Sequence, residues 1–379
     1  MKVSYLVEIK EPHLHLARVT MTFQRTEKTR SVEVYLPSWS PGSYLMREYS
    51  RHIRWVKATQ ENGETLWHEQ TAKGTWVIDW DKSQLNKSLK GCSITYEIYL
   101  HELTVRTSHV DNSHAYLHGP SYLMNVHQTH IEPTIEFRFL PLWDHISTAL
   151  KEVEGPREKF VYSAEDYDRL VDRPVEIGRQ ETDGFMVGTV PHALAFYGLT
   201  YPHGQNLKKD FQTIVTEGRK YFGGFPFDHY QFIPHFAPRI YGGLEHLDST
   251  VLQFDGRRLG VRKDYLSFLS LVAHEYFHAW NVKRIRPEVL GPFDYRNEAY
   301  TSLLWLSEGL TSFMDDWYVY RAGLSTLEEY VEIVKGNLEG YYGTPGRKFH
   351  SLEDSSFNAW IKLYRPDENS KNSSISYYL

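Results

Sequence analysis

The first part of the chain alternates between apolar and polar residues, with the two-residue period of strands that bury one face. The alternation covers residues 3–9, 13–23, 31–36, 76–80 and 93–100, which are rich in Val, Ile, Thr, Tyr and Trp. Turn-forming residues separate these segments. The pattern predicts an antiparallel β domain, whose end we expect near the charged stretches at residues 151–159 and 166–174.

The period changes in the second part of the chain. Two further strands are predicted near residues 231–236 and 250–254, and helical spacing of apolar residues follows over 265–282 and 297–320. A third helix is predicted over 326–338, with Ser325 as N-cap and Glu328 completing a capping box. We therefore predict an α+β protein with a β-rich domain at residues 1–170 and a second domain, a small sheet plus helices, at 171–379.

Composition narrows the function classes. The formal net charge of −6 gives no reason to propose a nucleic acid as partner. No stretch approaches the about 18 consecutive apolar residues of a membrane span, so none is expected. Cys92 is the only cysteine, which excludes a disulfide framework, and residues 1–9 alternate like a strand rather than a signal peptide. We expect a cytoplasmic location.

The segment from His274 to His278 has the pattern H-E-x-x-H and lies within a predicted helix. Helix residues four apart lie on one face, so both imidazoles can reach a single Zn²⁺. Glu275 is rotated from them by about 100° and can instead activate the attacking water as a general base. Because two such histidines can also be ordinary core or surface residues, the motif needs a third ligand.

A third histidine at the spacing H-E-x-x-H-x-x-G-x-x-H is ruled out, because Asn281 and Arg284 occupy those positions. A carboxylate from the following helix remains. Glu308 lies within an apolar run, where an unpaired carboxylate would be costly to bury, and a metal would relieve that cost. Asp315 lies on the same helix face and can accept the N–H of a ligating histidine, although a surface charge is an alternative. We predict Glu308 as the third ligand of one Zn²⁺.

Four motifs, in this order, give the sequence a resemblance to the glycyl aminopeptidase family, relatives of aminopeptidase N among the thermolysin-like zinc peptidases (gluzincins). They are residues 36–44 (Leu-Pro-Ser-Trp-Ser-Pro-Gly-Ser-Tyr), 241–246 (Tyr-Gly-Gly-Leu-Glu-His), the H-E-x-x-H pattern, and 305–311 (Trp-Leu-Ser-Glu-Gly-Leu-Thr). The resemblance implies an N-terminal β domain, a thermolysin-like catalytic domain and a C-terminal helical part with a PDZ-like domain. The present sequence would stop before that last part.

The resemblance also implies how substrate binds. Residues 242–246 are similar to the G-x-M-E-N motif of aminopeptidase N, where an edge strand pairs with the substrate backbone and the glutamate binds the free α-amino group. Carried over, Glu245 anchors the amine, while Gly242 and Gly243 let the substrate backbone approach closely. Leu244 and His246 depart from that motif.

Tyr378 fits the first position of a second family pattern, Y-x-K-G, whose tyrosine hydrogen-bonds the oxyanion of the tetrahedral intermediate. The sequence ends before the Lys-Gly of that pattern. Residues 37–44 are far from the catalytic motifs in sequence, and we interpret them as a structural turn of the first domain.

The expected function is a zinc-dependent aminopeptidase that hydrolyses N-terminal peptide bonds of peptides with a free N-terminus. The resemblance implies a preference for small N-terminal residues, Gly or Ala. Two alternatives stay open. A zinc endopeptidase of the same fold would keep its activity on N-acetylated peptides after Glu245→Gln, and a catalytically silent protein-binding scaffold would fail to bind zinc.

Overall fold

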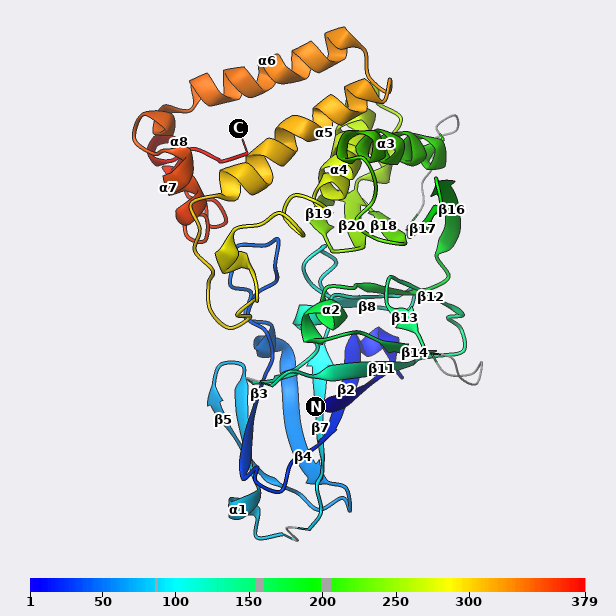
Figure 1. Cartoon of the computed structure of the whole chain (residues 1–379), viewed down its shortest axis with the longest axis vertical. Coiled ribbons are helices and arrows are strands. Elements are labelled where there is room, and N and C mark those ends of the chain that lie inside the picture. The colour runs from blue at the N-terminus through cyan, green and yellow to red at the C-terminus, as the bar shows by residue number, and fades with distance from the viewer. Residues whose placement is uncertain (86–87, 128, 154–159, 199–205, 379) are drawn as a thin grey trace. The chain divides into compact units, whose positions relative to one another are not determined.

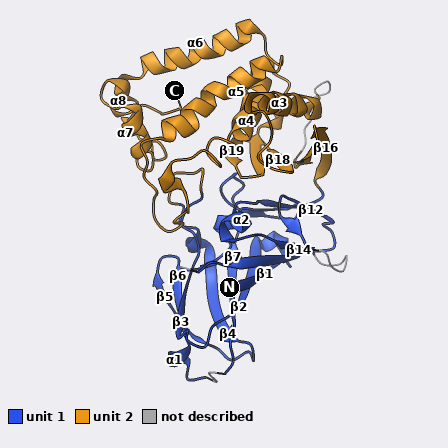
Figure 2. Cartoon of the chain, in the orientation of Figure 1, with its two compact units in different colours: residues 1–40, 47–179 blue, residues 41–46, 180–379 orange. Residues whose placement is uncertain are grey.

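The computed structural model describes residues 1–378 apart from 86–87, 128, 154–159 and 199–205 (Figure 1). The chain divides into two compact units (Figure 2). Unit 1 comprises residues 1–40 and 47–179, and unit 2 comprises residues 41–46 and 180–379. The predicted domain boundary lies near the charged stretches 151–159 and 166–174. Most of the first stretch, residues 154–159, lies outside the described residues. The second contains a short helix, α2 (Tyr167–Val171), which Asp166 caps.

Unit 1 is built from sheets, as the two-residue period predicts. Strand β1 shows the cause, since Val3, Tyr5 and Val7 are buried while the residues between them are more exposed. Within the described residues the largest sheet has seven strands. In spatial order they are β13 (Lys151–Glu152), β14 (Phe160–Ser163), β11 (Glu132–Arg138), β1 (Lys2–Glu8), β2 (Leu16–Gln24), β7 (Gly91–Tyr99) and β4 (Ile53–Gln60).

Two smaller sheets complete the described part of unit 1. One has the order β10 (Asn125–Val126), β3 (Ser31–Tyr35), β6 (Thr75–Asp79) and β5 (Trp67–Ala72), and a short helix α1 (Trp80–Ser83) follows β6. The other has the order β12 (His145–Thr148), β15 (Val175–Gly178), β9 (Ala115–Leu117) and β8 (His109–Val110).

The predicted strands of unit 1 are confirmed, with one error at a boundary. The strand predicted over residues 13–23 begins only at Leu16, because Pro12–Leu14 form a 3₁₀ turn that ends at His15 with a left-handed φ of 60°. Proline at the start of this turn fixes its own φ and favours the turn over a strand. The sequence analysis identified no strand between residues 101 and 196, where β8 to β17 lie.

Unit 2 contains one mixed sheet. Its described strands, in spatial order, are β16 (Glu181–Val187), β17 (Val190–Phe196), β18 (Tyr230–Phe236), β20 (Ser249–Phe254) and β19 (Tyr241–Glu245). The pairs β17–β18 and β18–β20 are parallel, while β19 pairs antiparallel with β20. Among the described strands β19 has a partner on one side only, so it is an edge strand.

Helices cover one face of this sheet. Alternate residues of its strands share a hydrophobic core with α3 (Leu207–Phe222), α4 (Arg262–Phe277) and α5 (Leu310–Arg321). Further helices follow in the order α6 (Leu327–Gly343), α7 (Leu352–Phe357) and α8 (Ser370–Ser373). The sequence analysis missed α3. None of the described helices is long and apolar enough to cross a membrane.

Three helix predictions need correction. The first predicted helix spans residues 262–277 rather than 265–282, and the second begins only near residue 304, with a π turn at Trp305–Gly309 before α5. The capping box of α6 uses Thr326 and Glu329 instead of Ser325 and Glu328. Arg262 explains the shift by one residue, because its guanidinium binds both carboxylate oxygens of Glu329 at 2.8 Å, a tertiary contact absent from any local pattern.

Candidate metal centre

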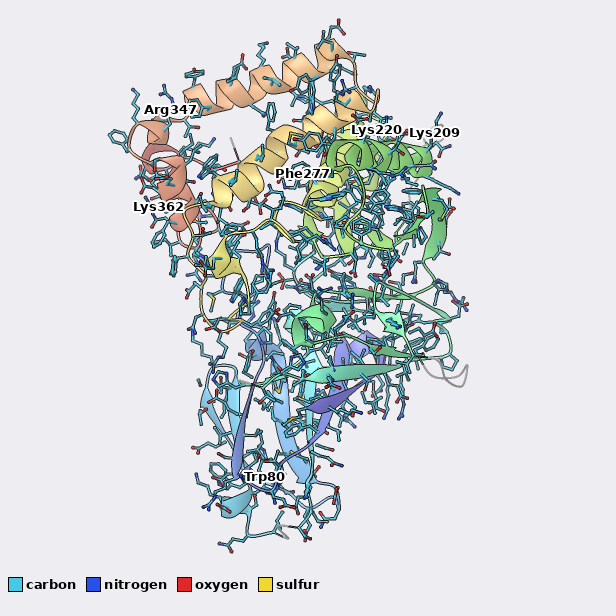
Figure 3. All side chains as sticks on the ribbon, in the orientation of Figure 1. Trp80, Lys209, Lys220, Phe277, Arg347 and Lys362 are labelled. Atoms are coloured by element: carbon cyan, nitrogen blue, oxygen red, sulfur yellow. The ribbon has the colours of Figure 1, made fainter. Side chains whose placement is uncertain are left out.

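Helix α4 positions the two histidines of the H-E-x-x-H pattern. The helix packs against β19, β20 and α5, and its last residue, Phe277, is labelled in Figure 3. His278 is the C-cap and keeps right-handed helical backbone angles, with its N–H donating to the carbonyl of His274 at 3.2 Å. The two imidazoles therefore lie one turn apart, with ring centroids 4.7 Å from each other.

Glu308 meets both imidazoles. It lies in the π turn at Trp305–Gly309, and its Oε2 is 3.5 Å from His274 Nε2 and 3.2 Å from His278 Nε2. Two atoms that each lie about 2.05 Å from a tetrahedral Zn²⁺ are about 3.3 Å apart. The separations between these two nitrogens and the carboxylate oxygen thus have the length expected for ligands that share one zinc ion.

The far side of each imidazole is held by a hydrogen-bond acceptor. Nδ1 of His274 lies 2.9 Å from Oδ2 of Asp315, and Nδ1 of His278 lies 2.6 Å from the carbonyl oxygen of Asn281. An acceptor at Nδ1 holds a proton there, which leaves Nε2 as the ring nitrogen that can bind a metal ion. Asp315 therefore stands where an acceptor for a ligating histidine would be needed.

Asn281 joins the two segments that carry the cluster. Its side-chain amide donates to the carbonyl oxygens of Leu306 and Ser307, at 3.0 and 3.1 Å, and lies 3.1 Å from the hydroxyl of Thr311. These bonds attach the end of α4 to the turn that contains Glu308. The sequence analysis used Asn281 only to exclude a third histidine, because no local pattern reveals a bond to a segment 25 residues away.

Glu275 is buried beside this cluster, on the side of β19. Its Oε2 has no hydrogen-bond partner among the described residues. A Cβ atom built on Gly243 would lie only 2.0 Å from Glu275 Oε1, so any side chain at that position would displace the carboxylate. The space that a Cβ of Gly243 would occupy is taken by Glu275, and close approach of a substrate backbone at this glycine stays a prediction.

Glu245 lies at the end of β19 and is only 4% exposed. Glu245, Glu275 and His278 each offer an atom within 4.8 Å of the atoms offered by the other two. Two buried carboxylates therefore lie next to one of the histidines of the cluster.

Gly42 packs on the carboxylate of Glu245. A Cβ at this glycine would lie 2.6 Å from both carboxylate oxygens, and its φ of +81° disfavours any other residue. The interpretation of residues 37–44 as a turn of the first domain is wrong for its second half, since Pro41–Met46 belong to unit 2. The correction depends on a contact between residues about 200 positions apart, which a local turn signal cannot reveal.

Burial and neighbouring charges shift the pKa values of the site. Burial raises the pKa of Glu275 to about 7, against the lowering effect of the two imidazoles. Burial alone would also raise the pKa of Glu308, but His278 and His274 outweigh it and hold that pKa well below its usual range. Burial opposes the charged form of His278, yet Glu308 and Glu245 raise its pKa to about 9. Glu308 is thus anionic, while Glu275 titrates near neutrality.

The last described residues, Tyr377 and Tyr378, lie beside the turn of Glu308 and the ring of His274. A Cβ at Gly309 would lie 2.3 Å from the carbonyl oxygen of Tyr377, so this glycine lets the terminal segment pack on the turn of Glu308. The ring of Tyr378 lies 6.4 Å from that of His274. Burial, followed by the carboxylate of Glu308, raises the pKa of Tyr378 well above its usual value, so its phenol stays protonated and can donate a hydrogen bond.

The family model of the peptidase M61 N-terminal domain matches residues 4–179, and that of the M61 glycyl aminopeptidase matches residues 267–379. The comparison with curated proteins found no match.

Among solved structures, an aminopeptidase N family protein from Idiomarina loihiensis is 30% identical, with a TM-score of 0.92. The match covers 99% of the present chain and 64% of the Idiomarina chain, so the present chain spans less than two thirds of that relative. A mutant M1 zinc metallopeptidase from Deinococcus radiodurans, bound to a Tyr-Ser-Ala substrate, is 14% identical with a TM-score of 0.53, over 96% of this chain and 80% of the other. This second similarity is one of fold.

Proposed function

Because the chain belongs to the M61 glycyl aminopeptidase family, we propose that it is a zinc-dependent aminopeptidase. Its substrates are peptides with a free N-terminus, of which it hydrolyses the first peptide bond. The observation that carries the proposal is the convergence of two imidazoles on one oxygen of Glu308, next to the buried carboxylates of Glu275 and Glu245.

His274, His278 and Glu308 would hold the zinc ion. The donor set of two imidazoles and one carboxylate is typical of catalytic zinc sites, which keep a position open for water or substrate. The separations of 3.2 and 3.5 Å between the nitrogens and the oxygen fit this assignment. When bound, the ion supplies Lewis acidity, which makes water a stronger nucleophile at neutral pH and polarises the scissile carbonyl.

Glu275 is the general base. A carboxyl group with a pKa of about 7 can take a proton from water and return it to the leaving amine. Its Oε2, which lacks a hydrogen-bond partner among the described residues, is the atom that would receive the proton. The contact with Gly243 limits how far this carboxylate can move, so it stays close to His278.

Glu245 binds the α-ammonium group of the substrate. A buried carboxylate at the end of an edge strand can select a cationic N-terminus while the strand pairs with the peptide backbone. Asp315 orients His274 through its Nδ1, and the hydroxyl of Tyr378 donates a hydrogen bond to the oxyanion of the transition state.

The proposed preference for Gly or Ala at the N-terminus is supported by the description of the matching family as glycyl aminopeptidases.

The test combines metal content with activity. Zinc is counted by mass spectrometry in the purified chain and in His278→Ala, and both are assayed on Gly- and Ala-terminated peptides with N-acetylated peptides as controls. We expect the variant to lose one zinc equivalent and its activity, and the N-acetylated peptides to remain uncleaved. Equal cleavage of acetylated peptides would favour an endopeptidase, and an unchanged zinc content in the variant would contradict the proposed ligand set.

A further inference from the structure

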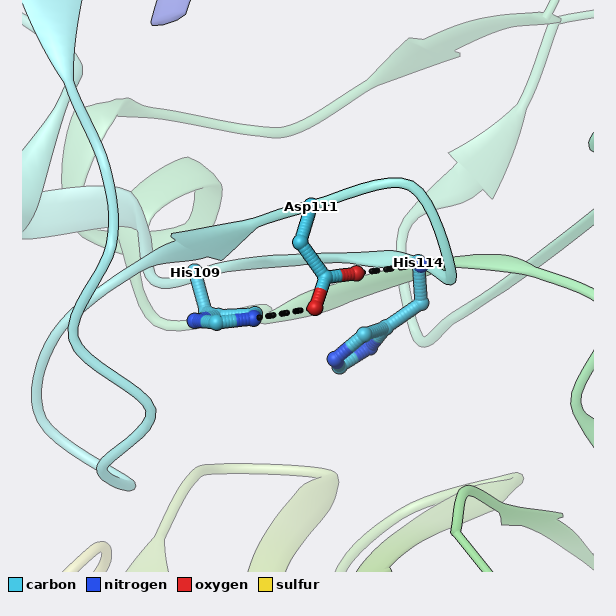
Figure 4. A group of neighbouring side chains, drawn as sticks. All are labelled: His109, Asp111 and His114. Atoms are coloured by element: carbon cyan, nitrogen blue, oxygen red, sulfur yellow. Dashed lines mark hydrogen bonds and ion pairs between the residues drawn. The ribbon is translucent and has the colours of Figure 1, made fainter. Parts of the chain in front are cut away.

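Unit 1 contains a second group of side chains that can bind a metal, and the sequence analysis did not identify it. The group consists of His109, Asp111 and His114, in the hairpin formed by β8 and β9 (Figure 4). One potential ligand atom from each of the three lies within 4.8 Å of the atoms from the other two. The proposed aminopeptidase site uses none of these residues.

The turn of the hairpin aims the carboxylate of Asp111. Its Oδ1 accepts hydrogen bonds from the backbone N–H groups of Ser113 and His114, at 2.7 and 3.2 Å. The other oxygen, Oδ2, lies 3.2 Å from Nε2 of His109. This separation is again close to the about 3.3 Å between two atoms that share a tetrahedral zinc ion.

His114 has the environment of a metal-binding histidine. It is 1% exposed, and its Nδ1 lies 2.6 Å from a carboxylate oxygen of Glu176, a residue of β15 that is fully buried. A carboxylate at one ring nitrogen fixes the tautomer and makes the other nitrogen a better ligand. Since Glu176 takes the Nδ1 side, a metal would bind His114 through Nε2.

The charges of the group also favour a cation. Asp111 and Glu176 bring two carboxylates to the hairpin, and Glu176 is cut off from water. Nδ1 of His109 is buried and has no hydrogen-bond partner among the described residues.

We propose that His109, Asp111 and His114 bind a second divalent transition-metal ion, with Zn²⁺ as the ion to be tested. Two imidazoles and one carboxylate suit zinc and its neighbours in the first transition row rather than Mg²⁺ or Ca²⁺, which prefer oxygen ligands. All three ligands come from one hairpin, so the ion would stabilise the loop between β8 and β9.

The experiment counts zinc in the full chain when the proposed catalytic site is disabled. Protein stripped with a chelator is dialysed against buffer with a slight excess of Zn²⁺, and bound zinc is measured by mass spectrometry. We expect two equivalents in the parent and one in His278→Ala. Adding Asp111→Asn to His278→Ala should reduce the remaining zinc affinity at least 10-fold. The amide oxygen of the asparagine can still accept the turn hydrogen bonds, so the loss would reflect the missing negative charge and not a disrupted turn.

His101→Asn in the His278→Ala background is the matched control, because the exposed His101 stacks on His109 with centroids 4.9 Å apart but is not among the three ligands. It should retain one equivalent. Replacement of Zn²⁺ by Co²⁺ gives a second readout, since tetrahedral Co²⁺ absorbs strongly in visible light and the band should vanish with Asp111→Asn. An absence of zinc in folded His278→Ala, or zinc that survives Asp111→Asn unchanged, would overturn the second site. Either result would leave the proposed aminopeptidase site untouched.

Discussion

The two histidine–carboxylate clusters of this protein offer the same donors on different local structures. In unit 2 the donors come from the end of α4 and from a π turn, with 29 residues between His278 and Glu308, whereas in unit 1 all three lie within one six-residue segment, 109–114. A carboxylate supports one histidine in each cluster, Asp315 behind His274 and Glu176 behind His114. The N···O separations of 3.2 to 3.5 Å are nearly the same.

The clusters differ in the carboxylates around them. In unit 2 one oxygen of Glu275 is buried without a hydrogen-bond partner among the described residues, and a second carboxylate, Glu245, ends an edge strand beside it. In unit 1 the carboxylates of Asp111 and Glu176 are engaged by the turn and by the histidines. A general base needs an oxygen that can reach the proton it takes, and Oε2 of Glu275 meets this condition more readily than the engaged carboxylates of unit 1. The comparison therefore supports the two proposals, of catalysis in unit 2 and of a structural ion in unit 1.

The largest expected effect concerns Glu275. Glutamine has the same size and would fit beneath Gly243, but it cannot accept a proton. Glu275→Gln should lower kcat by about 10²- to 10⁴-fold with zinc content unchanged at both clusters, as measured by steady-state kinetics and mass spectrometry. Glu353→Gln, at an exposed position of α7, is the matched control and should keep full activity. A kcat within threefold of the parent value would show that Glu275 is not the general base. The proposed functional difference between the two clusters would then lose its support.

The next effect concerns recognition by Glu245. Glu245→Gln keeps the shape of the side chain but removes a charge-assisted bond to the substrate ammonium, which is worth about 1.5–3 kcal/mol. We expect kcat/KM on Gly-terminated peptides to fall about 10- to 100-fold, while zinc content stays constant. A kcat/KM on Gly-terminated peptides within threefold of the parent value would show that Glu245 does not bind the substrate amine.

The carboxylates at Nδ1 of His274 and His114 can be substituted to test whether the two clusters bind zinc in the same way. Asp315→Asn should weaken zinc binding in unit 2, and Glu176→Gln should weaken it in unit 1, each by about 10- to 100-fold. Competition with a chromophoric chelator measures both affinities, with Glu176→Gln examined in the His278→Ala background. The analogy fails if Asp315→Asn weakens its site while Glu176→Gln has no effect on the other.

The smallest effect concerns a buried histidine that lies outside both clusters. His192 is 1% exposed among aromatic rings, and burial lowers its pKa to about 4, while a hydrogen bond to the carbonyl of Val190 opposes that shift. Since its folded pKa is below the unfolded value of about 6.5, its neutral form stabilises the fold above pH 6.5 and this stability is lost as the pH falls.

Between pH 7 and pH 6 this histidine should cost the parent about 0.7 kcal/mol of unfolding free energy. Urea unfolding of the parent and of His192→Gln measures the difference, and an NMR titration of the His192 ring gives its pKa directly. Zinc content should be equal in both proteins. A ring that titrates near pH 6.5 would contradict the proposed cause, and a change in zinc content would link His192 to a cluster.

Much of the fold follows from local periods. The alternation of buried and exposed residues identifies β1 and β7, and the spacing of apolar residues identifies α4 and α5, because these periods reflect how each element buries one face. The boundaries do not follow from the pattern alone. The shift of the α6 cap depends on Arg262, which is 67 residues away from Glu329. Short strands such as β8 and β9 are too brief to establish a period.

The sequence by itself determined the parts of the site that depend on helix geometry. A spacing of four residues places His274 and His278 on one face of α4, and an acidic residue in an apolar run identified Glu308 as the candidate third ligand.

Only the tertiary structure decided the rest. The placement of Glu275 beneath Gly243, the bonds of Asn281 to the turn of Glu308, and the pairing of His114 with Glu176 join residues that are between 25 and 62 positions apart in the chain. The physical reason is that hydrogen bonds and close contacts act over a few ångströms in space. Local periodicity specifies the elements, but only their packing brings such residues within that distance.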